Sequence, residues 1–154
     1  MDVKVRFATY SDIDTILKLL YELGRPAPKN NIQKQKFSEI IRSFLSMDTN
    51  KILLAIIPDR DLGVDRIIGL LSYILIQRLN LEKLELWIPE LVVSHEYRDK
   101  GIGTILLNEC ESVAKNNNCY RIRLESGNDR IEAHNFYKKL GFKQSAFMFE
   151  KRLV

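Results

Sequence analysis

The stretch that decides the fold is Arg98-Asp99-Lys100-Gly101-Ile102-Gly103, which lies between the apolar run Leu91-Val92-Val93 and a helical pattern from Ile105 to Ala114. A strand, a glycine-containing turn and a helix start form an anion site. Backbone N–H groups at a helix N-terminus lack internal partners, and the helix dipole favours negative charge there. The two glycines let a pyrophosphate approach the backbone, and the neighbouring arginine and lysine add positive charge. The stretch therefore predicts a cradle for a phosphorylated cofactor.

The spacing of the glycines excludes two common phosphate-binding motifs. A Walker-type loop requires G-x-x-x-x-G-K-[ST], which the chain does not contain. A dinucleotide fingerprint requires a third glycine, but Thr104-Ile105-Leu106 follows Gly103. That fingerprint is also typical of a first strand–helix–strand unit, whereas this stretch lies two-thirds of the way along the chain.

Length and composition are those of an ordinary soluble globular protein, and we expect a single domain over residues 1–154. Hydrophobic residues make up 45% of the chain and charged residues 29%. The net charge of +4 is modest and scattered, so we expect no nucleic-acid partner. No stretch is long and apolar enough for a membrane span and no signal peptide is visible, so we expect no membrane partner and a cytoplasmic location. Cys110 and Cys119 lack metal-ligand spacing, so we expect reduced thiols and no metal site.

Hydrophobic periodicity predicts an α/β fold with a mixed sheet. Pro89 interrupts one of the expected strands, and a bulge or a local parting of strands is expected there because proline donates no ladder hydrogen bond. The expected strands cover residues 3–7, 51–57, 66–79, 84–93, 120–125 and 142–153, and the expected helices cover 11–23, 37–45, 105–114 and 129–140.

Three blocks of this sequence, in the same order, resemble the GNAT superfamily of N-acetyltransferases. Arg98-Asp99-Lys100-Gly101-Ile102-Gly103 matches its (Q/R)-x-x-G-x-(G/A) pattern, and Ala133-His134-Asn135-Phe136-Tyr137-Lys138-Lys139-Leu140-Gly141-Phe142 is similar to its A-x-x-F-Y-x-x-x-G-F segment. Val5-Arg6-Phe7-Ala8-Thr9 resembles its first strand. The resemblance covers nearly the whole chain. It implies the GNAT fold, a central twisted mixed sheet of about six to seven strands flanked by about four helices.

The resemblance also implies acetyl-CoA as the cosubstrate and assigns residues to hold it. The backbone of Leu91, Val92 and Val93 would hold the pantetheine arm as an added strand, and one of its N–H groups would bond the thioester oxygen. The implied pyrophosphate contacts are Arg98, Asp99, Lys100, Gly101, Ile102, Gly103 and Thr104, with Asn135 as an alternative cofactor contact.

The implied chemistry needs a proton donor for the departing thiolate and a base for the amine. Tyr137 matches the family's general-acid tyrosine, and a phenol is protonated at neutral pH. Glu90 is the candidate base because it lies on the strand that leads into the cofactor site. Glu85 is the runner-up, Glu125 is a further candidate, and some family members use water.

The acceptor that we expect is a small-molecule amine, which attacks the thioester directly in a ternary complex. Neither cysteine lies in a nucleophile motif, which disfavours an acetyl-cysteine intermediate. In this family the first two helices and their loop often shape the acceptor side, which here means Tyr21 to Asn31 with Arg25, together with Tyr73 and Trp87.

Three alternatives stay open from the sequence. A protein N-terminus or lysine is an alternative acceptor. A non-catalytic acyl-CoA-binding module would keep the cradle and lose the acid and the base. A homodimer is the third, because residues 146–153 could pair across an interface or remain an edge blunted by Lys151 and Arg152.

Overall fold

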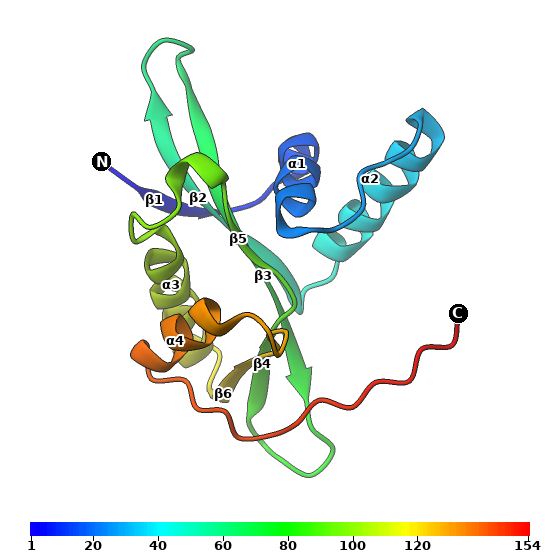
Figure 1. Ribbon diagram of the computed structural model, residues 1–154, viewed down its shortest axis with the longest axis vertical. Helices are drawn as coiled ribbons and strands as arrows, with labels where there is room; N and C mark the ends of the chain where they lie inside the picture. The colour runs from blue at the N-terminus through cyan, green and yellow to red at the C-terminus, as the bar shows by residue number, and fades with distance from the viewer. The chain divides into compact units, whose positions relative to one another are not determined.

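The computed structural model describes residues 1–154 as an α/β chain (Figure 1). Its internal contacts gather into two compact units, residues 1–123 and residues 124–154. The strands are β1 (Lys4–Phe7), β2 (Asn50–Asp59), β3 (Val64–Gln77), β4 (Leu84–Ile88), β5 (Leu91–Val93) and β6 (Cys119–Leu124). The α-helices are α1 (Ile13–Leu23), α2 (Asn31–Ser46), α3 (Ile102–Asn116) and α4 (Ile131–Lys139), and short 3-10 turns η1 and η2 cover Tyr10–Asp12 and His95–Tyr97.

The first unit is built on a sheet of strand order β1-β2-β3-β4-β6, with β5 paired to β3 outside that path. Strands β1 to β4 pair antiparallel with their neighbours, and so do β3 and β5. The connection from β4 and β5 to β6 runs through α3, the kind of helical crossover that parallel strands require. The mixed sheet and the four helices confirm the predicted fold class.

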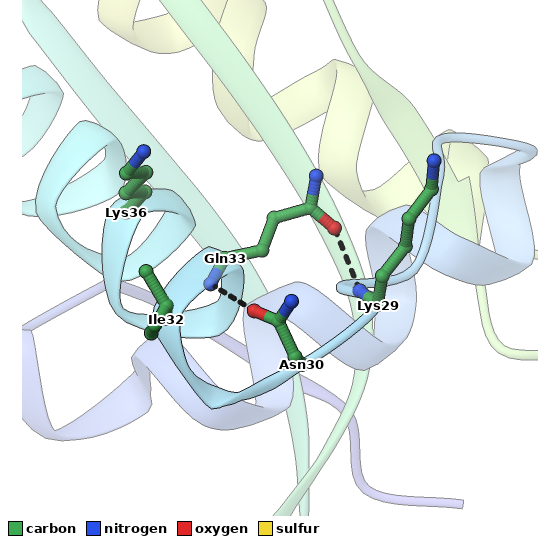
Figure 2. Close-up of a pocket in the computed structure, with 5 residues that line it drawn as sticks. All are labelled: Lys29, Asn30, Ile32, Gln33 and Lys36. Carbon is green, nitrogen blue, oxygen red and sulfur yellow. Dashed lines mark hydrogen bonds between the residues drawn. The ribbon is translucent and has the colours of Figure 1, made fainter.

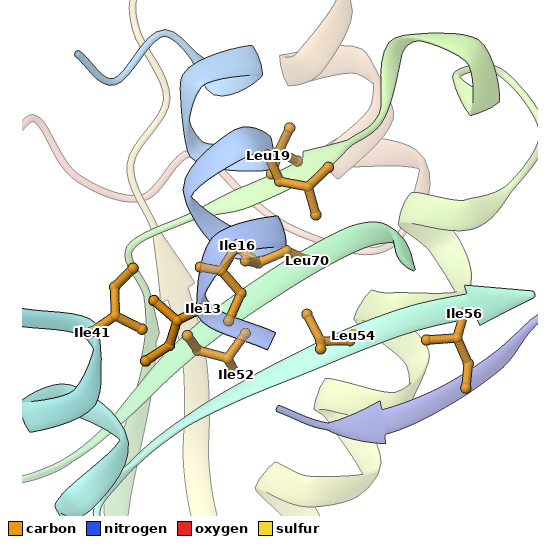
Figure 3. Packing of buried hydrophobic residues seen from close by; sticks show 9 residues of the cluster. Ile13, Ile16, Leu19, Ile41, Ile52, Leu54, Ile56 and Leu70 are labelled. Carbon is orange, nitrogen blue, oxygen red and sulfur yellow. The ribbon is translucent and has the colours of Figure 1, made fainter. Parts of the chain in front are cut away.

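The two faces of the sheet carry different helices (Figure 1). Helices α1 and α2 cover one face, where Ile16 and Leu54 are fully buried (Figure 3). Val92 of β5 belongs to the same buried cluster. Helix α3 packs on the opposite face. It approaches closely at Gly69 of β3, where a Cβ would lie 3.2 Å from Ile102 and from Leu106. The glycine therefore sets how near the start of α3 lies to the sheet.

A bulge at Pro89 confirms the expected irregularity in the long strand. Ile74 of β3 lies opposite Trp87, while two residues earlier the Ser72 N–H donates a hydrogen bond to Glu90 O. The chain advances three residues from Trp87 to Glu90, while β3 covers only two from Ile74 to Ser72. One extra residue therefore lies between Trp87 and Glu90. Because side chains alternate along a strand, this extra residue turns Glu90 to the same face as Trp87, the face covered by α1 and α2.

The second unit contains α4, whose C-cap is Leu140, and Gly141 follows in the left-handed region (φ +90°). The strand that the sequence predicts over 142–153 is absent, so that expectation was wrong. Residues 143–154 are exposed and have no partner strand. Alternating apolar side chains favour a strand only where a neighbouring strand supplies hydrogen bonds. No helix combines the length and apolar character needed to cross a membrane.

Candidate functional site

The start of α3 has the geometry that the sequence predicts for an anion cradle. Gly101 is its N-cap residue and adopts a left-handed conformation (φ +79°), and Asp99 before it has φ +59°. The first hydrogen bond of the helix runs from Ile105 N–H to Gly101 O (3.1 Å). The N–H groups of the residues between them therefore lack helical partners and are available to an anion.

The two cationic side chains of the cradle are exposed and bonded to nearby carbonyls. Arg98 Nε donates to Val93 O (3.3 Å), and Lys100 Nζ donates to Glu96 O (3.1 Å). These bonds hold both side chains beside the turn that leads into α3. The predicted cradle residues are thus brought together on one continuous turn.

The backbone of β5 pairs on one side only, with β3. Ser72 N–H bonds to Glu90 O (3.0 Å) and Ser94 N–H bonds to Ile68 O (2.8 Å), and these bonds set the alternation of the pair. By that alternation the N–H groups of Leu91 and Val93 point to the unpaired edge. This edge, next to the start of α3, has the open backbone groups that an extended ligand needs.

Glu90 lies immediately before that open edge and is held by a buried serine. Ser72 is 3% exposed. Its hydroxyl donates to Glu90 Oε2 and accepts from the Glu90 backbone N–H (3.1 Å). The other carboxylate oxygen, Oε1, lies 3.7 Å from Arg25 NH2, and the Glu90 side chain is 25% exposed. A carboxylate with one oxygen fixed and the other accessible fits the role of a general base.

Glu85, the runner-up base, is instead a structural carboxylate. It is fully buried and accepts hydrogen bonds from Tyr120 Oη (3.0 Å), from Arg121 Nε (2.8 Å) and from Arg123 Nε. Burial by itself raises the pKa of Glu85, but these hydrogen bonds outweigh burial and lower the pKa to about 2. A group so acidic and so enclosed is a poor proton acceptor near neutral pH.

The segment between α1 and α2, expected on the acceptor side, is fixed at both ends. Gly24 ends α1 with φ +102°, and Arg25 N–H bonds to Leu20 O (3.0 Å). At the start of α2, Asn30 Oδ1 accepts from Gln33 N–H (2.8 Å) and Gln33 Oε1 accepts from Lys29 N–H (2.6 Å), as Figure 2 shows. These caps fix the two ends of the loop that carries Arg25.

The two aromatic residues expected on the acceptor side lie on opposite faces. Trp87 is on the α1 and α2 face, opposite Ile74, and the guanidinium of Arg123 lies 5.3 Å from its ring centre. Tyr73 lies four residues after Gly69 on β3, so its side chain points to the same face of the sheet, which α3 covers. It is buried there, so its expected place on the acceptor side was wrong. Burial, followed by Cys110 and Cys119, raises the pKa of Tyr73 to about 12.

Within the second unit, Tyr137 lies on α4 among other aromatic rings. Its ring centre is 5.3 Å from that of Phe136 and 5.7 Å from that of Phe142. Burial raises the pKa of Tyr137, and Arg130 opposes the shift only in part. Its phenol is therefore protonated at neutral pH. His134 bonds to Gly127 O (2.8 Å) within this unit, and Asn135 is exposed on α4.

The comparison with known families bears directly on this arrangement. The family model described as "Acetyltransferase (GNAT) family" matches residues 17–142, which include β5, the cradle and Tyr137. The chain belongs to the GNAT family.

Curated relatives and a solved structure support this assignment to GNAT over nearly the whole chain. The aminoalkylphosphonate N-acetyltransferase of Salmonella typhimurium is 30% identical over 97% of this chain and 91% of its own length. The glucosamine 6-phosphate N-acetyltransferase of Trypanosoma brucei brucei is 24% identical over 93% and 90%. A GNAT acetyltransferase structure from Staphylococcus aureus has a TM-score of 0.78 and 26% identity over 99% and 100%. The alignments with two uncharacterized Bacillus subtilis proteins span only 30% and 54% of those proteins.

Sequence reasoning does not identify two residues that lie around the candidate site. Ser72 is one, although a single polar side chain in the apolar run of β3 is a signal in retrospect. Glu22 of α1 is the other: its carboxylate accepts from His95 N–H (2.8 Å) and from Ser94 Oγ (3.4 Å), just after β5. No sequence pattern indicates that Glu22 contacts Ser94 and His95, because these residues are far apart along the chain.

Proposed function

We propose that this GNAT protein transfers an acetyl group from acetyl-CoA to a small-molecule amine. The observation that carries the proposal is the unpaired edge of β5, which contacts α3 and is connected through η2 and the turn at 98–101 to the glycine-capped start of that helix. An extended arm that ends in a pyrophosphate needs both features in that order along the chain. The two relatives with named acceptors act on small amines, which supports the acceptor class.

The cradle residues and β5 would hold the cosubstrate. The Leu91 and Val93 N–H groups would bond the pantetheine arm and the thioester oxygen. Arg98, Asp99, Lys100, Gly101, Ile102, Gly103 and Thr104 would surround the pyrophosphate, with the open N–H groups at the helix start as the main donors. Asn135 on α4 stays an alternative contact. When bound, acetyl-CoA supplies the acetyl group as an activated thioester.

In the proposed reaction the chain's own residues move two protons. Glu90 Oε1 accepts a proton from the acceptor ammonium, since Oε2 is occupied by Ser72. The neutral nitrogen then attacks the acetyl carbon, so that a C–N bond forms and the C–S bond breaks. The attacking nitrogen loses its second proton to water, and Tyr137 gives its phenolic proton to the departing sulfur. Glu90 then returns its proton to water and Tyr137 takes one back, so that one proton is released in total.

The cysteines support a direct transfer. Cys110 is fully buried, and burial, followed by the neighbouring Cys119, raises its pKa to about 12. Burial also raises the pKa of Cys119. Both sulfurs are therefore protonated thiols at neutral pH, which are weak nucleophiles.

The experiment is acetyl-CoA-dependent thiol release against amino acids, polyamines, aminoglycosides and short peptides. We expect release above the no-acceptor rate with at least one class of small amine, and intersecting double-reciprocal plots, as a ternary complex requires. Release only with peptides would contradict the acceptor class. If none of the acceptors raises thiol release above the no-acceptor rate in a protein that binds acetyl-CoA, that result would favour a non-catalytic module. Parallel plots would indicate a covalent acetyl-enzyme instead.

A further inference from the structure

The loop after α1 places one guanidinium beside the proposed base. Arg25 NH2 lies 3.7 Å from Glu90 Oε1, which is close enough for charge attraction but too far for a hydrogen bond. The Arg25 side chain makes no hydrogen bond, so its fork of N–H donors is unused. The site thus presents an accessible carboxylate oxygen and an uncommitted guanidinium next to each other.

The backbone of this loop limits how far Arg25 can move away. Its N–H is bonded to Leu20 O, and the loop closes at the capped start of α2, where Lys29 N–H bonds to Gln33 Oε1. The side chain is 56% exposed and therefore retains freedom to adjust to a ligand. A fixed backbone with an adjustable cationic head is suited to grip an anion.

We propose that the acceptor is a small zwitterion whose amine contacts Glu90 and whose anionic group contacts Arg25. This inference rests on the proposed function. Because the two protein groups are only 3.7 Å apart, the amine and the anion must be separated by one or two carbons. Carboxylate and phosphonate groups both match the planar guanidinium fork, so α-amino acids and short aminophosphonates share the required chemistry.

The same pair disfavours two other kinds of amine. A polyamine brings a second positive charge toward Arg25, and like charges at this range repel. A monoamine that lacks an anionic group leaves the Arg25 donors without a partner and gains nothing from them. The Ser72 hydroxyl donates a hydrogen bond to Glu90 Oε2, so the acceptor amine and Arg25 must share the Oε1 side of the carboxylate.

The test compares kcat/KM at saturating acetyl-CoA for glycine, aminomethylphosphonate, glycinamide and spermidine. We expect at least one zwitterion to exceed both glycinamide and spermidine by about tenfold or more, the scale of a charge-assisted bidentate contact. The ratio of glycine to aminomethylphosphonate identifies the anion. In Arg25→Gln the advantage of the zwitterion should be lost while the rate with glycinamide is retained.

Lys18→Gln is the matched control, because Lys18 is an exposed cation of α1 that lies outside the acceptor-side segment and does not contact Glu90. It should leave all four values unchanged. Equal or better use of glycinamide or spermidine by the wild-type protein would overturn the zwitterion proposal and leave acetyl transfer standing. An equal loss of kcat/KM with all four acceptors in Arg25→Gln would also overturn the zwitterion proposal and leave acetyl transfer standing. If none of the four is acetylated and no other amine is, the proposed function fails as well.

Discussion

The Ser72 hydroxyl and Glu90 are joined twice, through the carboxylate Oε2 and through the Glu90 backbone N–H. Ser72 belongs to the central strand β3, while Glu90 lies at the break between β4 and β5. The bulge at Pro89 turns the Glu90 side chain to the face of Ser72, and the two hydrogen bonds fix it there. A rigid strand thus holds the proposed base immediately before the open edge of β5.

Replacement of the base tests its role directly. Glu90→Gln keeps the size of the side chain but removes its ability to accept the ammonium proton. We expect kcat to fall by about 10²–10⁴, the usual contribution of general-base catalysis. Steady-state kinetics should show an unchanged dissociation constant for acetyl-CoA, because the β5 backbone is preserved. Full activity in Glu90→Gln would assign the proton transfer to water or to another carboxylate such as Glu125.

Ser72 should act on the rate through Glu90. Ser72→Ala removes both hydrogen bonds, and we expect kcat to fall by about tenfold or less, since a freed carboxylate still accepts a proton but spends less time in place. In the Glu90→Gln background the same substitution should have little further effect on kcat. A double-mutant cycle measures this coupling, and strictly additive losses would show that Ser72 acts independently of Glu90.

The proton donor can be tested without disturbing the aromatic packing of the second unit. Tyr137→Phe keeps the ring contacts with Phe136 and Phe142 and removes only the hydroxyl. We expect kcat to fall by about 10²-fold or more while acetyl-CoA affinity is retained. Phe142→Leu serves as a packing control. If Tyr137→Phe turns over at the wild-type rate, the phenol has no part in the chemistry.

The buried carboxylate Glu85 should make the fold sensitive to acid. Its pKa is about 2 in the folded protein and near the ordinary value of 4.5 when unfolded. Its stabilising contribution is therefore complete above about pH 4.5 and declines as the pH falls toward 2. Urea unfolding of the wild type and of Glu85→Gln between pH 7 and pH 3 should show the difference in stability between them narrow with acidity. A difference that stays constant over this range would contradict the assigned pKa.

Much of the fold follows from patterns that are local in the sequence. The turn before α3 was predictable because the glycines, the preceding apolar strand and the following helix are contiguous. The bulge at Pro89 was predictable because proline cannot complete a ladder. Local patterns also indicated Glu90, although only the register between β3 and the bulge shows that its side chain turns toward α1.

The remainder depends on pairings between distant segments. Glu85 and Glu90 are equivalent by sequence, and only the three donors from β6 show that Glu85 is structural. The partnership of Ser72 with Glu90 likewise requires the register between strands. The expected strand at 142–153 is absent because no neighbouring strand pairs with it, and a sequence pattern does not reveal whether a partner is present.

The most direct test of the central claim is calorimetric titration of acetyl-CoA into wild type, Gly101→Asp and Gly63→Asp. Both glycines have positive φ and open space around the missing Cβ, so the two substitutions impose similar backbone strain. Only Gly101 caps α3, where a carboxylate would repel the pyrophosphate. We predict wild-type affinity in Gly63→Asp and at least ~100-fold weaker binding in Gly101→Asp. Unchanged affinity in a folded Gly101→Asp protein would contradict the assignment of this helix start as the cofactor cradle.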